Sequence, residues 1–321
     1  MPFKARLCFV SSNSLLSKFL TLKHLICDFT RFFFFVHLLN LIDSDINTGT
    51  YKELRMLLAT QDEFQTHLFI DDAGSYCAQY DGFILRSVFQ PIFDKQMNIF
   101  GYEALLRIQD SNAQPIRPDL FFSDLSRTLE QILNIERLSR VIHIRNFSTF
   151  APLNCKLFLN VLPESAVLLY TSHLPDINAM LLESRISALN LSPQNIVFEL
   201  VEFHYQDEKR LINAIEMIKE HDFFVAIDDY GSEASSAKRV SQLNPNVIKI
   251  DRALLLKYEA GVKAPLLSAL SIAKIQDALT IVEGVETPHQ YELMKKLNIG
   301  YFQGFLLGKP LPLHEQNHQA A

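Results

Sequence analysis

Two adjacent carboxylates, Asp228 and Asp229, close an apolar run that begins at Phe223. A short run of this kind, rich in Phe and Val, predicts a buried β-strand. Paired acids after a single strand are most often a solvated turn when nothing else accompanies them. Here they are accompanied, because five further strand-like runs each place a polar side chain near their end. The repetition favours a shared functional site over a series of unrelated turns.

These further positions carry an amide, an amine or a carboxylate. They are Asn160, Glu199, Lys249, Glu283 and Gln303. In parallel α/β folds the carboxyl ends of the strands meet at one edge, where ligands bind and chemistry takes place. We therefore expect these side chains to converge on one mouth, together with Glu103 from an earlier strand-like run.

The chemistry of such a mouth follows from its charges. Five carboxylates in one cavity would repel one another strongly unless cations neutralised them. Oxygen ligands without a cysteine or a histidine pair favour hard ions such as Mg²⁺ or Mn²⁺. Two such ions about 3.5–4 Å apart support phosphodiester hydrolysis by activating a water molecule. Asp228 and Asp229 can direct one carboxylate to each ion, and Lys249 can orient the nucleophile or stabilise phosphoryl charge.

The elements that must position these side chains alternate along the chain. Ser87–Phe93 and Ile99–Ile108 predict an antiparallel hairpin. Residues 118–150 predict two helices, because the runs 120–133 and 135–147 have apolar residues at three- and four-residue steps. From residue 156 onward six strand-like runs alternate with helical runs, among them one predicted helix at Leu254–Ile275. With the hairpin the strands number eight, which predicts a closed α/β barrel with parallel pairing after the hairpin.

Bulk properties narrow the possible partners. The 321-residue chain has a formal net charge of −6, which argues against polymeric DNA or RNA as a partner. A small phosphorylated ligand stays possible, because metal ions can supply positive charge. The four cysteines form no CxxC pair and indicate free thiols in a reducing cytoplasm. The pair Asp71–Asp72 has no accompanying strand-end ligands, so we expect a turn there.

The first 55 residues differ from the rest because they are rich in Phe and Leu. Their longest charge-free apolar run, Phe32–Ile42, is far shorter than the roughly 20 residues that a membrane-spanning helix needs. Three interpretations stay open: amphipathic or partly ordered helices, a membrane-surface anchor, or a segment outside the functional domain. In the last case Met56 is an alternative start. The predicted division is a segment of uncertain role at 1–55, a mixed lead-in at 56–84, a barrel at 85–313 and a polar tail at 314–321.

Seven short motifs occur one after another along the predicted barrel. They are YEALLR at 102–107, FLNV around Asn160, FELVE at 198–202, AIDDYG at 226–231, IKID at 248–251, EGVET at 283–287 and FQGFLLGKP at 302–310. Together they resemble the motif series of the EAL-domain cyclic-di-GMP phosphodiesterases over about Leu85–Leu313. The resemblance implies a modified TIM (β/α)8 barrel whose first strand is antiparallel to the others. It also implies hydrolysis of cyclic di-GMP to linear pGpG with two Mg²⁺ or Mn²⁺ ions, in a homodimer.

The resemblance also implies roles for individual residues. The expected ligands of one metal ion are Glu103, Asn160, Glu199 and Asp228. Asp229 would serve the second ion, and Glu283 would lie at the metal and water site. Lys249 would contact the attacking water or the phosphate. Glu103, Lys249 and Glu283 are thus the candidate catalytic residues.

Substrate contacts and loop support are implied in the same way. Gln90 and Arg107 match positions that contact the dinucleotide, and a guanidinium suits a phosphate on charge grounds alone. Gln303 would help to order the site, and Glu202 would hold the loop after Asp229. That loop reads YGSEASSA, so Glu233 stands where the family usually has a glycine. Losing this glycine could restrict the conformations of the loop.

Two rival functions stay open. The first is a catalytically silent receptor that binds cyclic di-GMP and passes on its occupancy through residues 1–85 or a dimer contact. The second is a metal-dependent phosphohydrolase that acts on another phosphodiester. Membrane association is possible but not favoured by the sequence.

Overall fold

The computed structural model describes residues 57–152, 154–163, 165–167, 179–200, 207–231 and 237–319. The predicted N-terminal segment 1–55 and Met56 lie outside the described residues. Glu202 and Glu233, the loop residue that departs from the family pattern, also lie outside them. Across the described ranges, no helix is both long enough and apolar enough to cross a bilayer. The domain boundaries at residues 85 and 313 stay a prediction.

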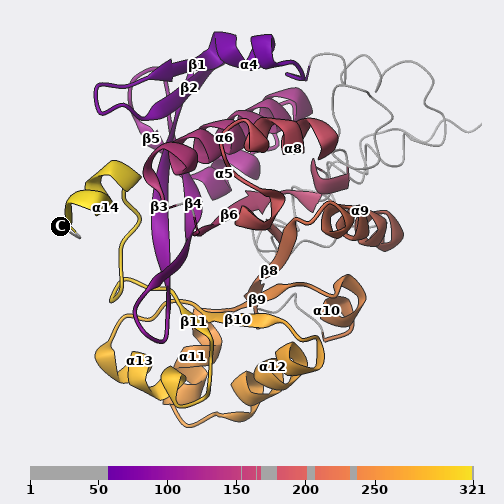
Figure 1. Cartoon of the computed structure of the whole chain (residues 1–321), viewed down its shortest axis with the longest axis vertical. Helices are drawn as coiled ribbons and strands as arrows, with labels where there is room; N and C mark the ends of the chain where they lie inside the picture. Colours follow the sequence, from indigo (N-terminus) through magenta and orange to yellow (C-terminus); the bar gives the residue numbers. More distant parts are fainter. Residues whose placement is uncertain are drawn as a thin grey trace, which may run out of the picture.

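A closed barrel of eight strands forms the centre of the described structure (Figure 1). In their order around the ring, the strands are β3 (Phe83–Asp94), β4 (Ile99–Gln109), β6 (Lys156–Val161), β7 (Ile196–Leu200), β8 (Phe224–Tyr230), β9 (Val247–Ile250), β10 (Leu279–Val282) and β11 (Tyr301–Phe302). Strand β11 pairs with β3 and so closes the ring. Strand β3 is antiparallel to both neighbours, and the other pairs around the ring are parallel. The predicted α/β barrel with an antiparallel first strand is confirmed.

The hairpin of β3 and β4 opens the barrel as predicted. The two strands pair along most of their length, and Gln90 lies opposite Glu103. The carboxylate of Asp94 holds the connecting turn, because its Oδ1 accepts hydrogen bonds from the backbone N–H groups of Gln96 and Asn98, both at 2.8 Å. An aspartate that caps its own turn in this way is a common cause of chain reversal.

Helices cover the outside of the barrel. Those that connect β6 to β11 include α8 (Ala179–Ser187), η1 (Pro193–Asn195), α9 (Glu208–Glu220), α10 (Ala237–Leu243), α11 (Arg252–Glu259), α12 (Ala264–Ile275) and α13 (Pro288–Lys295). In α9 the buried residues Leu211, Ile215 and Ile218 recur at steps of four and three. They pack into the main core between the helices and the strands. Figure 1 shows α11, α12 and α13 together on the side of β9, β10 and β11.

The helices before β6 correct one predicted boundary. The structure has α5 (Pro118–Phe122) and α6 (Leu129–Phe150), so the predicted outer bounds 118 and 150 are confirmed, but the predicted break near residue 134 is wrong. The break therefore falls before Thr128, whose hydroxyl accepts a hydrogen bond from the N–H of Gln131 at 3.1 Å and so begins α6. Asn134 does not interrupt the helix, because its Oδ1 accepts from the N–H of Leu58 at 2.9 Å.

The predicted single helix Leu254–Ile275 is also wrong. Two helices, α11 and α12, occupy this stretch and are separated by residues 260–263. Gly261 follows the end of α11 with φ of +93°, a left-handed conformation that glycine adopts without steric penalty. Pro265 lies in the first turn of α12, where its missing N–H leaves no hydrogen bond unmade.

The lead-in extends the barrel sheet on one side. It consists of α4 (Gln61–His67), β1 (Leu68–Ile70) and β2 (Tyr76–Tyr80). Strand β2 pairs antiparallel with the first part of β3, and β1 pairs with β2. Phe64, Ala78 and Leu85 share a buried cluster with residues of α6. The lead-in therefore packs on α6.

Four smaller features complete the fold. The predicted turn at Asp71 is present, since the N–H of Gly74 donates to the carbonyl of Asp71 at 2.9 Å. Cys77 and Cys155 are buried free thiols, as predicted for them. Strand β5 (Pro115–Ile116) pairs with the end of β4. Helix α14 (Leu313–Gln319) lies beside β3 in Figure 1.

Candidate active site

Two layers of inward-facing side chains fill the barrel. The lower layer is apolar and fully buried, and it consists of Ile92, Phe158, Val197, Ala226, Val247 and Ile281. Side chains alternate between the two faces of a strand, so residues two positions farther along face the interior as well. After the last five of these residues, that second position holds Asn160, Glu199, Asp228, Lys249 and Glu283. The apolar layer thus supports a polar layer at the carboxyl ends of the strands.

Lys249 lies at the centre of the polar layer and is 1% exposed. Its Nζ is 2.7 Å from Oε1 of Glu283 and 2.8 Å from Oε1 of Glu199. The same atom is 2.9 Å from Oδ1 of Asp228 and 3.4 Å from Oε2 of Glu103. A single ammonium group therefore contacts four carboxylates that come from four different strands or strand ends.

The excess of negative charge shifts the ionisation of this layer. Burial alone would lower the pKa of Lys249, but the surrounding carboxylates raise that pKa well above its ordinary value. The ammonium therefore stays charged at physiological pH. Burial raises the pKa of Glu199 and that of Glu283, and repulsion from neighbouring carboxylates adds to the effect against the opposing attraction of Lys249. The layer holds more negative charge than one lysine can neutralise.

Several buried oxygen atoms of the layer have no hydrogen-bond donor within the described part of the chain. Gln303 donates from Nε2 to Oε2 of Glu103 at 2.6 Å, but its own Oε1 is left without a partner. Oε2 of Glu199 is also without one, although this side chain is fully buried. An unsatisfied buried acceptor costs about 1–3 kcal/mol. These oxygen atoms fit a bound hard cation, which would satisfy them directly or through its water ligands.

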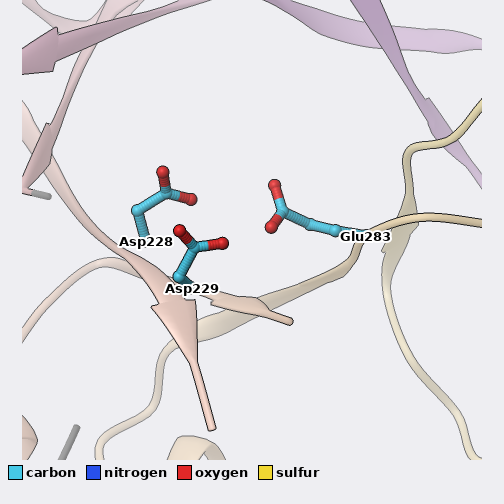
Figure 2. A group of neighbouring side chains, drawn as sticks. All are labelled: Asp228, Asp229 and Glu283. Carbon is cyan, nitrogen blue, oxygen red and sulfur yellow. The ribbon is translucent and has the colours of Figure 1, made fainter. Parts of the chain in front are cut away.

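A second group of oxygen ligands lies at the same mouth. Figure 2 shows the carboxylates of Asp228, Asp229 and Glu283 turned toward one another, and one oxygen from each lies within 4.8 Å of the others. Asp229 has a φ of +50°, and the β8–β9 register shifts between Ile227 and Tyr230. This irregularity interrupts the alternation of the strand and lets both aspartates face the mouth. Burial, and then repulsion from Asp228, raises the pKa of Asp229 to about 6.

Comparison with known proteins shows the family of this chain. The family described as EAL domain matches residues 83–310 of the chain. The chain belongs to the EAL domain family. The probable cyclic di-GMP phosphodiesterase PdeN of Escherichia coli strain K12 is 27% identical over 234 residues, which are 71% of this chain and 43% of PdeN. The chain thus spans less than half the length of this curated relative.

Solved structures of similar fold include two complexes with cyclic di-GMP. One is Bacillus subtilis YkuI with an EAL domain, in complex with substrate c-di-GMP and calcium; it has a TM-score of 0.61, 24% identity, and covers 73% of this chain and 60% of its own. The other is the manganese and cyclic-diGMP complex of Klebsiella pneumoniae BlrP1 at pH 6, with a TM-score of 0.60, 21% identity, and coverage of 71% and 56%. At these identities the likeness establishes the fold of the EAL domain.

The other predicted residues of this EAL domain lie around the mouth. Asn160 is exposed and lies beside Glu199 in the register of β6 and β7. Gln90 faces Glu103 across the hairpin, and its Nε2 donates to the carbonyl of Gly308 at 3.1 Å. Arg107 is exposed, and its Nη1 donates to the carbonyl of Leu106 at 3.0 Å. Arg107 and Asn160 line one cavity, which lies beside the carboxylate layer.

A group of polar residues in the wall of that cavity was not predicted from the sequence. Glu136, Ser139, Arg140 and His143 lie on α6, and each is at least nine-tenths buried. Polar residues on the buried face of a helix are unusual in an apolar core. The signal available in the sequence was the recurrence of Glu136, Arg140 and His143 at steps of four and three within a largely apolar helix.

Proposed function

We propose that this EAL domain hydrolyses cyclic di-GMP to linear pGpG with two divalent cations, Mg²⁺ or Mn²⁺. The observation that carries the proposal is the set of buried carboxylates around Lys249. They come from separate strands, and four of them surround one ammonium group. The composition of two similar structures supports it, because they hold cyclic di-GMP together with calcium or manganese. The name of PdeN supports the activity.

The ligand sets proposed for the cations follow the two groups of oxygen atoms. For the first cation they are Glu103, Asn160, Glu199 and Asp228, and for the second they include Asp229 with Glu283 beside it. When bound, such cations activate a water molecule and neutralise the charge of the phosphodiester. Asp228 and Glu283 belong to the group whose oxygen atoms already lie within 4.8 Å of each other.

The chain's own residues supply orientation and charge. Lys249 Nζ contacts carboxylates on several sides, so it can hold the attacking water or a phosphoryl oxygen in a defined place. Gln303 orients Glu103 through the hydrogen bond of 2.6 Å. Arg107 is proposed to bind a phosphate, and Gln90 is proposed to contact the dinucleotide while it holds the segment at Gly308. Glu202 is proposed to hold the loop after Asp229, and both Glu202 and loop residues 232–236 lie outside the described residues.

Turnover by the purified full-length chain tests the proposal. The protein is incubated with cyclic di-GMP and Mn²⁺ or Mg²⁺, and the products are separated by chromatography. We expect pGpG, and we expect Glu103→Gln to lower kcat/KM by about 10²–10³-fold because a charged ligand is lost. Glu216→Gln on the exposed face of α9 is the matched control and should keep full activity.

Two other outcomes would each support one of the rival functions instead. Tight binding of cyclic di-GMP without product would identify a silent receptor. Hydrolysis of bis(p-nitrophenyl) phosphate without hydrolysis of cyclic di-GMP would identify a phosphohydrolase for another substrate. Homodimer formation, which only the family resemblance suggests, is a separate prediction that sedimentation equilibrium can test.

A further inference from the structure

One edge of β3 lacks a strand partner over part of its length. Strand β4 pairs along most of the opposite edge. On this edge β2 pairs only with Phe83–Leu85, and β11 pairs only with Phe93–Asp94. Within the described part of the chain, no strand pairs here with residues 86–92. Leu311 spans the gap at one residue, because Phe89 donates to its carbonyl at 2.8 Å and accepts from its N–H at 3.1 Å.

Gln316 on α14 reinforces this bridge between Phe89 and Leu311. Its Nε2 donates to the carbonyl of Phe89 at 2.6 Å and to the carbonyl of Leu311 at 2.9 Å. A single side-chain amide thus connects both backbones of the bridge. The helix that carries it is anchored, because Leu313 at its start is buried in the main core. The amide therefore limits how far the two backbones can separate.

The residue after Phe89 is Gln90, a proposed contact of the dinucleotide. Ile92 belongs to the apolar layer inside the barrel. Strand β3 is antiparallel to its neighbours, so the inward-facing position on its side of the mouth is two residues earlier, at Gln90. Gln90 also lies opposite Glu103 on β4. The bridge is therefore adjacent in the chain to a side chain of the polar layer.

The segment that forms the bridge also contacts Gln90 directly. Nε2 of Gln90 donates to the carbonyl of Gly308 at 3.1 Å. A Cβ at position 308 would lie 2.4 Å from Cγ of Pro91, so the close approach of this segment to β3 requires glycine. The backbone and the side chain of β3 are thus held by one short stretch, residues 308–311, which Gln316 fastens at its far end.

We propose that Gln316 is a positioning residue of the site, which fixes the Phe89 backbone and so holds Gln90 where it contacts the dinucleotide. This role rests on the proposed function, because it requires cyclic di-GMP to occupy the mouth. Gln316 acts through β3 and Gln90, and not by contact with the substrate. The role falls on the predicted polar tail 314–321, whose sequence alone indicated no function.

Steady-state hydrolysis of cyclic di-GMP by the purified full-length chain in Mn²⁺ tests this role. Gln316→Met keeps the length of the side chain but removes both hydrogen bonds. We expect it to raise KM by about 5- to 10-fold, because a displaced Gln90 binds the substrate less well. The value of kcat should change by less than about twofold, since Glu103 stays held by β4 and by Gln303.

Two further variants control this measurement. Gln316→Lys keeps donors for both carbonyls and should return KM to within about twofold of the wild type. Gln276→Met removes an exposed amide elsewhere, which donates to the hydroxyl of Ser241 at 3.4 Å, and should leave KM unchanged.

A double-mutant cycle with Gln90 separates positioning from a general loosening of the fold. Gln90→Met alone should raise KM by about 10-fold. Adding Gln316→Met to it should raise KM by less than about twofold more, because the side chain that Gln316 positions is already gone. Independent effects, or a general loss of packing, would instead multiply.

A raised KM in Gln316→Met, its recovery in Gln316→Lys and coupling to Gln90 together support the role of Gln316. An unchanged KM in a folded Gln316→Met, no recovery with lysine, or multiplying effects in the cycle overturn that role and leave the proposed function intact. A wild type that does not hydrolyse cyclic di-GMP overturns both. If Gln316→Met fails to unfold cooperatively in a thermal scan, Gln316→Asn, whose amide is one methylene shorter, takes its place.

Discussion

Replacing Lys249 by methionine tests whether its ammonium is the internal counter-ion of the site. Methionine keeps an unbranched stem but removes the charge that lies within 2.9 Å of three carboxylates. Removing one partner of a buried ion pair typically costs about 3–5 kcal/mol. Because several carboxylates lose their partner at once, we expect a decrease of about 5 kcal/mol in the free energy of unfolding at neutral pH in EDTA. For a domain of this size that corresponds to a Tm lower by about 10–20 °C.

A divalent cation should restore much of this loss. In Lys249→Met the carboxylates have no resident cation, so Mn²⁺ gains their full attraction, whereas in the wild type it meets a layer that Lys249 partly neutralises. Scanning calorimetry in EDTA and at increasing Mn²⁺ should therefore show a larger rise in Tm for the variant. Lys156→Met is the matched control on another barrel strand, because Lys156 Nζ contacts the carbonyl of Gln194 and the ring of Phe224.

Either of two results would contradict this role of Lys249. One is a Tm of Lys249→Met in EDTA within about 2 °C of the wild type, since a loss of 1 kcal/mol already exceeds this shift. The other is an equal rise in Tm for both proteins with Mn²⁺, which would mean that lysine and metal ion do not share the same carboxylates.

Two further predictions concern stability. The pKa of His143 is lowered to about 3 by burial and by Arg140, whereas an unfolded histidine titrates near about 6.5. The neutral ring therefore stabilises the fold fully above pH 6.5, and that stability falls with decreasing pH, by about 3 kcal/mol at pH 4.5. Urea unfolding at pH 7 and 4.5 should show a smaller decline for His143→Asn, and an equal decline would contradict the assignment. A Cβ at Gly101 would lie 2.6 Å from the backbone oxygen of Lys156, so Gly101→Ala should lower stability by about 2–3 kcal/mol. Gly300→Ala, where the nearest atom is at 3.6 Å, should lower it by less than about 1 kcal/mol in the same assay.

The barrel was predictable because its strands are short apolar runs in regular alternation with helices. Helix boundaries were harder to predict from the sequence. Asn134 lies inside α6, and its side chain accepts a hydrogen bond from Leu58, which is far away in the sequence. The break between α11 and α12 could have been recognised, because Gly261 and Pro265 are local signals for a helix end and a helix start.

The features of the site that follow from the sequence pattern were also predictable, and those that depend on contacts in three dimensions were not. Polar residues at strand ends indicated that side chains from distant parts of the chain lie together. The sequence could not indicate that Lys249 lies between four carboxylates, since this depends on depth within the barrel. It also could not indicate the φ of +50° at Asp229, which results from the local bulge of β8. The polar face of α6 becomes visible only when its boundaries are known.

Strand β3 belongs to two structures at once, because its first part carries β2 and its later part closes the ring against β11. A force applied to the lead-in acts on the same ribbon that holds Gln90 opposite Glu103. The lead-in is therefore mechanically coupled to the carboxylate mouth through β3. A rigid attachment at β1 or β2 would act on that mouth through β3 and through α6, on which the lead-in packs.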